Sequence, residues 1–88
     1  MKIIRSPIAG KKYRAIFDDD SHTDFGATGY DDYITTGDEV KKRAYLARHR
    51  TNEHWDNPHS AGAFSRYILW NKRTLQASIS DYKKRFGL

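Results

Sequence analysis

Residues 12–27 read KYRAIFDDDSHTDFGA, and their pattern predicts the strands of the N-terminal half. Apolar and polar side chains alternate along it with a period of two, which places Tyr13, Ala15 and Phe17 on one face of a strand. The polar DDDS turn cluster separates these residues from a second alternating run that ends at Ala27. The pattern predicts a β-hairpin or, with Ile3-Ile4-Arg5 as a third strand, a three-stranded antiparallel meander. Because an isolated hairpin is marginal in water, we expect this sheet to pack on helices.

The next segment predicts an ordered loop over residues 26–34, followed by a strongly basic helix. Thr36 has capping-box spacing to Glu39, so the helix is expected to start at Thr36 and to run to about Arg50. Its apolar stripe is thin and consists of Val40, Ala44 and Ala47. A helix with so little apolar surface and so many cations is expected to lean on acidic neighbours or to bind an anion.

Two further helices are predicted in the C-terminal third. The first begins near Pro58 or Ser60, and its expected buried face contains Ala61, Phe64, Tyr67 and Ile68, widened by Ala63 and Trp70. The second is capped by Thr74 and ended by Gly87. Its apolar stripe is formed by Leu75, Ile79, Tyr82 and Phe86. The sequence therefore predicts an α+β fold in which the N-terminal strands pack on three C-terminal helices.

Length and composition set the class of protein. A chain of 88 residues is expected to form one small basic domain, residues 1–88, and its 14% aromatic content supplies large side chains for the core. The chain has no Cys, so neither a disulfide framework nor a Cys-based zinc site is available. The longest apolar runs are short, so neither a membrane span nor a signal peptide is expected.

Charge is distributed unevenly along the chain. Residues 1–40 carry five basic and eight acidic side chains, a net −3, whereas residues 41–88 carry eleven and three, a net +8. This asymmetry is typical of a protein with one face for a polyanion, either nucleic acid or an acidic protein surface. Docking of the basic half on the acidic half, or improved solubility alone, explains it equally well.

The basic residues predict a nucleic-acid site. Cations are interleaved with aromatic rings that can stack on bases. The residues expected to contact phosphates are Lys41, Lys42, Arg43, Arg48 and Arg50. Secondary contacts are expected from Arg66, Lys72 and Arg73, with Trp55 as a stacking partner. Taken singly, Tyr45 and Trp55 are better explained as core aromatics with polar tips. Lys83, Lys84 and Arg85 in turn suit the negative end of the last helix dipole.

Metal and catalytic motifs are weak, and no cofactor is predicted. The acidic turn at residues 18–24 lacks the alternate carboxylates, glycine and terminal Glu of an EF-hand loop, so a solvated turn is expected. His49, His54 and His59 recur every fifth residue, a spacing that does not place them on one helical face. Residues 48–55 contain the residue types of a metal-dependent nuclease but no recognisable order of them.

Four segments resemble a family of small uncharacterised proteins of giant DNA viruses that infect amoebae and algae. They are residues 25–33 (FGATGYDDY), 45–50 (YLARHR), 60–72 (SAGAFSRYILWNK) and 80–86 (SDYKKRF). The sequence departs from that pattern at Phe64, where Leu is commoner, and at Arg73, where Pro is commoner. The resemblance implies a viral protein located in the cytoplasm or nucleus of an infected host cell, or in the virion. It implies no activity and no site residues.

The sequence therefore leaves three functions open. The first is a non-enzymatic, sequence-tolerant nucleic-acid-binding protein, with DNA as the expected partner. The second is a structural or adaptor protein that docks its basic helix on an acidic partner or forms a homo-oligomer. The third is a small nuclease that requires magnesium or manganese and loses activity on substitution of His49 or His54. No interaction with a membrane is expected.

Overall fold

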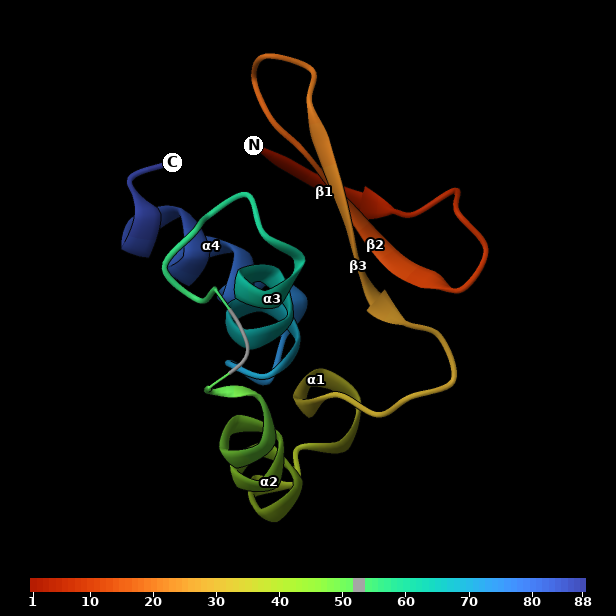
Figure 1. Ribbon diagram of the computed structural model, residues 1–88, viewed down its shortest axis with the longest axis vertical. Coiled ribbons are helices and arrows are strands. Elements are labelled where there is room, and N and C mark those ends of the chain that lie inside the picture. Colours follow the sequence, from red (N-terminus) through yellow and green to blue (C-terminus); the bar gives the residue numbers. More distant parts are fainter. Residues whose placement is uncertain (52–53) are drawn as a thin grey trace.

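The computed structural model describes residues 1–51 and 54–88. Its strands are β1 (Lys2–Arg5), β2 (Lys11–Ile16) and β3 (His22–Ala27). Its helices are α1 (Tyr33–Thr36), α2 (Glu39–His49), α3 (Ala61–Phe64), the π-helical turn η1 (Ser65–Leu69) and α4 (Leu75–Phe86). Figure 1 shows the sheet on one side of the molecule, α3 and α4 on the other, and α2 at the lower end. The predicted α+β class is confirmed, with the strands first in the chain and the helices after them.

The sheet is the predicted antiparallel meander, in the order β1-β2-β3. Tyr13 pairs with Phe25 across β2 and β3, and Phe25 is fully buried together with Ala15 on the same face. On the opposite face Arg14 pairs with Asp24, and their side chains form an ion pair at 3.0 Å. The alternation read from the sequence therefore separates a core face from a charged face as predicted.

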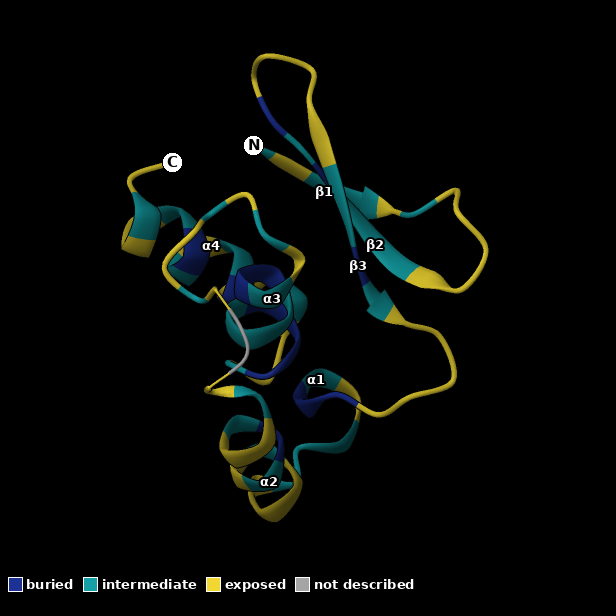
Figure 2. Cartoon of the chain, viewed as in Figure 1, coloured by how far each residue is buried: buried dark blue, intermediate teal, exposed yellow. Residues whose placement is uncertain are grey.

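A column of aromatic rings joins the sheet to the helices. Phe64 of α3 stacks on Phe25 at a centroid distance of 4.9 Å and on Tyr82 of α4 at 4.5 Å. All three rings are fully buried, and the Tyr82 hydroxyl donates a hydrogen bond to the carbonyl oxygen of Pro58 at 2.7 Å. Figure 2 shows buried residues concentrated in α3 and in the η1 segment that follows it, whereas most of α2 is exposed. The core therefore lies between the sheet and the C-terminal helices.

The region predicted as a loop over residues 26–34 is only partly a loop. β3 continues to Ala27, and Tyr33 begins the short helix α1. Asp32 caps this helix by accepting the backbone N–H of Thr35 at 2.8 Å, and its second carboxylate oxygen accepts from the Lys12 ammonium at 2.7 Å. A four-residue helix has little intrinsic stability, so this tertiary contact with β2 accounts for a helix that the local sequence did not predict.

The predicted capping box at the start of the basic helix is wrong. Thr36 is the last residue of α1, and Gly37, with φ +62°, ends that helix in the left-handed conformation. The N-cap of α2 is Asp38, whose carboxylate accepts two backbone N–H groups of the first turn at 2.9 and 3.2 Å. Glu39 instead accepts a hydrogen bond from the Tyr33 hydroxyl at 2.6 Å. An aspartate one residue before the helix thus replaces threonine as the cap.

The buried face of α2 also differs from the prediction. Val40 is 66% exposed and Ala47 is exposed, whereas Tyr45 is buried and Leu46 packs against the core. The Tyr45 ring lies nearly parallel to that of Trp70, with centroids 4.7 Å apart. A stacked aromatic ring buries far more surface than a stripe of alanines, so it sets the rotation of the helix.

The last two predicted helices are confirmed, with one change. Ser60 caps α3 by accepting the backbone N–H of Ala63, and Thr74 and Gly87 delimit α4 as expected. The expected second helix, however, continues as the π-helical turn η1, marked by a hydrogen bond from the Trp70 N–H to the Ser65 carbonyl oxygen at 3.0 Å. This change of pitch places Leu69 in the core, while Ala61 is exposed contrary to expectation. Within the described residues, no helix has the length and apolar character needed to cross a membrane.

Candidate functional site

Two of the predicted phosphate-contacting lysines interact within the protein. The Lys41 ammonium pairs with Asp31 at 2.6 Å, and this hydrogen-bonded ion pair raises the pKa of Lys41. Both side chains are about half exposed, so the pair contributes little to stability and its cation can exchange partners. Lys42 is more firmly held, because its ammonium donates to the Asn71 carbonyl oxygen at 2.8 Å and lies 4.5 Å from the Tyr33 ring centre.

Arg66 and Trp55 form a structural contact of their own. The Arg66 guanidinium donates to the Trp70 carbonyl oxygen at 2.9 Å and lies over the rings of Tyr67 and Trp55 at 4.8 and 5.7 Å. Burial lowers the pKa of Arg66. Among the described residues no hydrogen-bond partner is recorded for the buried Trp55 Nε1. Trp55 thus already serves as a platform for a cation of this chain, in keeping with its interpretation as a packing residue.

The remaining predicted cations are Arg43, Arg48, Arg50, Lys72 and Arg73, all exposed. Arg73 lies 5.8 Å from the Tyr33 ring centre, and Lys72 interacts electrostatically with the Asp81 carboxylate. For the other three, the described part of the chain offers no recorded side-chain partner. On α2, Arg48 lies two turns after Lys41 and shares its face, whereas Arg43 and Arg50 share a different face. The nine predicted residues therefore do not gather into one patch.

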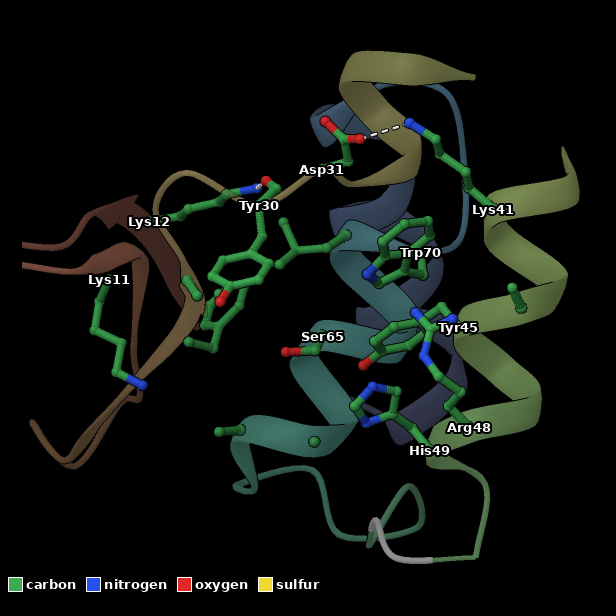
Figure 3. Close-up of a pocket in the computed structure, with 17 residues that line it drawn as sticks. Lys11, Lys12, Tyr30, Asp31, Lys41, Tyr45, Arg48, His49, Ser65 and Trp70 are labelled. Atoms are coloured by element: carbon green, nitrogen blue, oxygen red, sulfur yellow. Dashed lines mark hydrogen bonds and ion pairs between the residues drawn. The ribbon is translucent and has the colours of Figure 1, made fainter. Parts of the chain in front are cut away.

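A cleft of about 740 Å³ lies between the sheet and α2, with α3 and η1 forming its inner wall. Strand residues line one side, and residues of α2 line the other (Figure 3). Of the predicted site residues, Lys41 and Arg48 line this cleft. The basic and aromatic side chains that line it are Lys11, Lys12, Lys41, Arg48, His49, Phe25, Tyr30, Tyr45 and Trp70.

The helical wall of the cleft is a stack of rings. Tyr45 lies between Trp70, at 4.7 Å, and His49, at 4.4 Å, with interplanar angles of 10° and 26°. At the sheet side Gly26 adopts a φ of +78°, and a side chain there would place its Cβ 2.8 Å from Leu69 Cδ1. Only glycine fits both the backbone conformation and the close packing against Leu69 that forms this part of the wall.

The cleft has a positive electrostatic character. Among the described residues, four cations line it, and the one acidic lining residue is Asp31, the partner of Lys41. Lys12 is held by the Asp32 carboxylate and by the Tyr30 carbonyl oxygen at 2.6 Å. Burial alone would raise the pKa of Asp32, but the hydrogen bonds from Lys12 and Thr35 outweigh burial and lower it. Lys11 and Arg48 are exposed, with no side-chain partner recorded in the described ranges, so these two charges are available to a ligand.

Sequence reasoning missed the sheet side of this site. Lys11, Lys12 and Tyr30 belong to the acidic half of the chain and were not among the predicted contacts. The adjacent lysines at the start of β2 were a visible signal, but their position opposite Arg48 depends on how the sheet packs on the helices. Residues from both halves of the chain form the site. The net charge of each half, taken separately, does not reveal this.

The described residues contain no cluster of metal-binding side chains. Residues 1–51 and 54–88 contain no group of three His, Asp or Glu side chains placed to hold an ion. Asp18 pairs with the N-terminal ammonium at 3.1 Å, and Asp24 with Arg14. The nuclease hypothesis drew on residues 48–55, of which Asn52 and Glu53 lie outside the described residues.

The geometry defines a small basic α+β protein with a cationic, aromatic-lined cleft. Residues 1–49 match the model of a family of unknown function, DUF5754, and because they are more than half of the 88 residues, the chain belongs to this family. The matched region comprises the sheet, α1 and α2, and so contains the cleft residues Lys11, Tyr30, Lys41 and Arg48. No curated protein and no solved structure matches the chain. The viral origin and the host-cell or virion location implied by the resemblance stay predictions.

Proposed function

We propose that this protein binds nucleic acid with little sequence preference, without catalysing a reaction on it, and that the cleft between the sheet and α2 receives the phosphate backbone. The observation that carries the proposal is the placement of Lys11 and Arg48. Both are exposed, both line the cleft, and neither has a recorded side-chain partner among the described residues. An uncompensated pair of cations beside a concave surface attracts a polyanion.

Lys41 supplies a third charge to the same site. Its ion pair with Asp31 is exposed, so a phosphate can displace the carboxylate at small cost. Contacts of this kind position a nucleic-acid backbone and carry no sequence information, which supports binding to many sequences. If these three cations each neutralise one phosphate, the logarithm of the affinity should fall with the logarithm of the salt concentration with a slope of about −2 on a single strand.

Fluorescence anisotropy with labelled oligonucleotides of two unrelated sequences tests the proposal. We expect both to bind at low salt with affinities within a few-fold of each other. Arg48→Ala should weaken both, whereas Arg43→Ala is the matched control, because it removes the same charge from the same helix on another face. No binding at low salt, or equal losses for both variants, would contradict the proposal.

Light scattering with and without DNA separates this function from the adaptor alternative. A nucleic-acid-binding protein should gain mass on addition of the oligonucleotide. A stable oligomer whose mass is indifferent to DNA would instead favour the structural role, with α2 contacting an acidic partner chain.

A further inference from the structure

Tyr30 is an exposed aromatic side chain at the edge of the cleft. Its residue is 74% exposed, although it lines the same cleft as the buried rings of Tyr45 and Trp70. Within the described residues no hydrogen bond or ring contact is recorded for its side chain. A large ring left in water is not explained by the core of this protein, because tyrosine side chains usually bury most of their ring surface.

The backbone of Tyr30 is held in place even though its ring is exposed. The Lys12 ammonium donates to the Tyr30 carbonyl oxygen at 2.6 Å and simultaneously to Asp32, the cap of α1. The neighbouring Asp31 is tied to α2 through Lys41. Residues 30–32 are thereby fixed to both sides of the cleft, and the ring of Tyr30 is presented toward it (Figure 3).

The opposite wall is aromatic as well. Trp70, Tyr45 and His49 form a continuous stack on the α2 side of the cleft, while Tyr30 approaches from the sheet side (Figure 3). A cleft with aromatic rings on two sides and cations at Lys11 and Arg48 matches a planar ring carrying a negatively charged group. A nucleotide has both parts.

We infer that the cleft takes an unpaired base of single-stranded nucleic acid, with Tyr30 stacking on the base while Lys11 and Arg48 contact the adjoining phosphates. This inference rests on the proposed function and narrows its ligand. A cavity of about 740 Å³ lies in the size range of small-ligand sites and accommodates a nucleotide, whereas the bases of a duplex are stacked inside the helix and cannot enter it.

The test compares a single-stranded oligonucleotide with a fully paired, blunt-ended duplex that contains the same strand, using Tyr30→Ala, Tyr30→Phe and Arg48→Ala. Tyr30→Ala should weaken single-strand binding about tenfold, the loss typical for one base stacked on one ring, while Tyr30→Phe should stay within twofold of the wild type. Neither Tyr30 variant should change duplex binding. Arg48→Ala should weaken binding of both forms, because its contact is with phosphate. Since Tyr30 is exposed, Tyr30→Ala and Tyr30→Phe should both keep the melting temperature of the wild type.

The outcomes separate this inference from the proposed function. If the wild type binds duplex as tightly as single strand, or if Tyr30→Ala and Tyr30→Phe behave alike, the inference is overturned while nucleic-acid binding stands. If neither form binds at low salt, the proposed function itself fails. Single-strand preference that depends on the Tyr30 ring supports both.

Discussion

Helices α2 and α4 are of similar length and both carry several cations, yet they are attached to the protein in different ways. α4 buries Tyr82 and Ser78 completely, and its cations follow one another in the last turn, where they complement the helix dipole. α2 buries only Tyr45, and its cations are spread over its whole length. The basic residues of α4 therefore stabilise the end of their own helix, whereas most of those in α2 are exposed to solvent.

The difference shows which cations are informative about function. In α4, Arg85 pairs with Asp81 and lies over the Tyr67 ring at 4.2 Å, so its charge is used within the chain. In α2, Lys42 is used in the same way, but Arg48 faces the cleft with no recorded partner among the described residues. Substitutions in α4 should therefore change stability, and those on the cleft-facing side of α2, such as Arg48, should change binding.

The largest effect is expected from Tyr82→Ala in α4. The ring is fully buried between Phe64 and Phe86, and its removal leaves a cavity in the core. We expect a loss of about 3–5 kcal/mol in the free energy of unfolding, measured by urea denaturation. Tyr82→Phe, which removes only the hydrogen bond to Pro58, should cost about 1–2 kcal/mol. Similar costs for the two variants would show that α4 is not held by this packing.

A smaller effect is expected at the start of α2. Asp38→Ala removes the acceptor of two backbone N–H groups and should lower the free energy of unfolding by about 1 kcal/mol. Asp38→Asn keeps a capping oxygen and should cost only a few tenths of a kcal/mol. Equal losses, measured by chemical denaturation, would contradict the assignment of Asp38 as the cap.

The contact between β2 and α1 should make the free energy of unfolding depend on pH in the acidic range. The pKa of Asp32 in the folded protein is below its usual value of 3.8, so the unfolded state binds more protons as the pH falls. The stabilisation is complete at pH values above the usual pKa of Asp32. It is lost as the pH decreases through that value toward the lower pKa of the folded protein. Unfolding measured from pH 6 to pH 3 should thus be less pH-dependent in Asp32→Asn. The control Asp56→Asn changes an exposed carboxylate and should follow the wild type, and a variant slope identical to that of the wild type would contradict the Lys12 contact.

The smallest effects on stability are expected on the outer face of α2. Arg43→Ala and Arg50→Ala remove exposed side chains with no recorded partner in the described ranges, so the free energy of unfolding should change by less than about 0.5 kcal/mol. A thermal melt that shows a larger loss for either variant would mean that this face is part of the structure after all.

Sequence reasoning succeeded where the information is local. The alternation around Ala15 and the cap at Thr74 act through neighbours in the chain, and the structure has them as predicted. Of the two starts that the sequence left open for the preceding helix, Pro58 and Ser60, the structure has Ser60 as the cap. It failed at α1 and at the rotation of α2, because these depend on the distant contacts of Asp32 with Lys12 and of Tyr45 with Trp70.

The sequence predicted only the α2 side of the candidate site. Lys41 and Arg48 were expected from the basic helix, but Lys11 and Tyr30 come from a segment whose net charge is negative. The net charge summed along a chain does not distinguish the two faces of a strand. In that sum a few exposed lysines are outweighed by the carboxylates of the turns. Only the packing of the sheet against the helices places these residues opposite Arg48.

The most direct test of the account is an amide chemical-shift titration of the isotope-labelled protein with a short single-stranded oligonucleotide. We predict that the largest shifts occur at Lys11, Gly26, Tyr30, Ala44 and Arg48, which line the cleft from both halves of the chain. Shifts confined to the last turn of α4, or to Arg43 and Arg50 on the other face of α2, would contradict it.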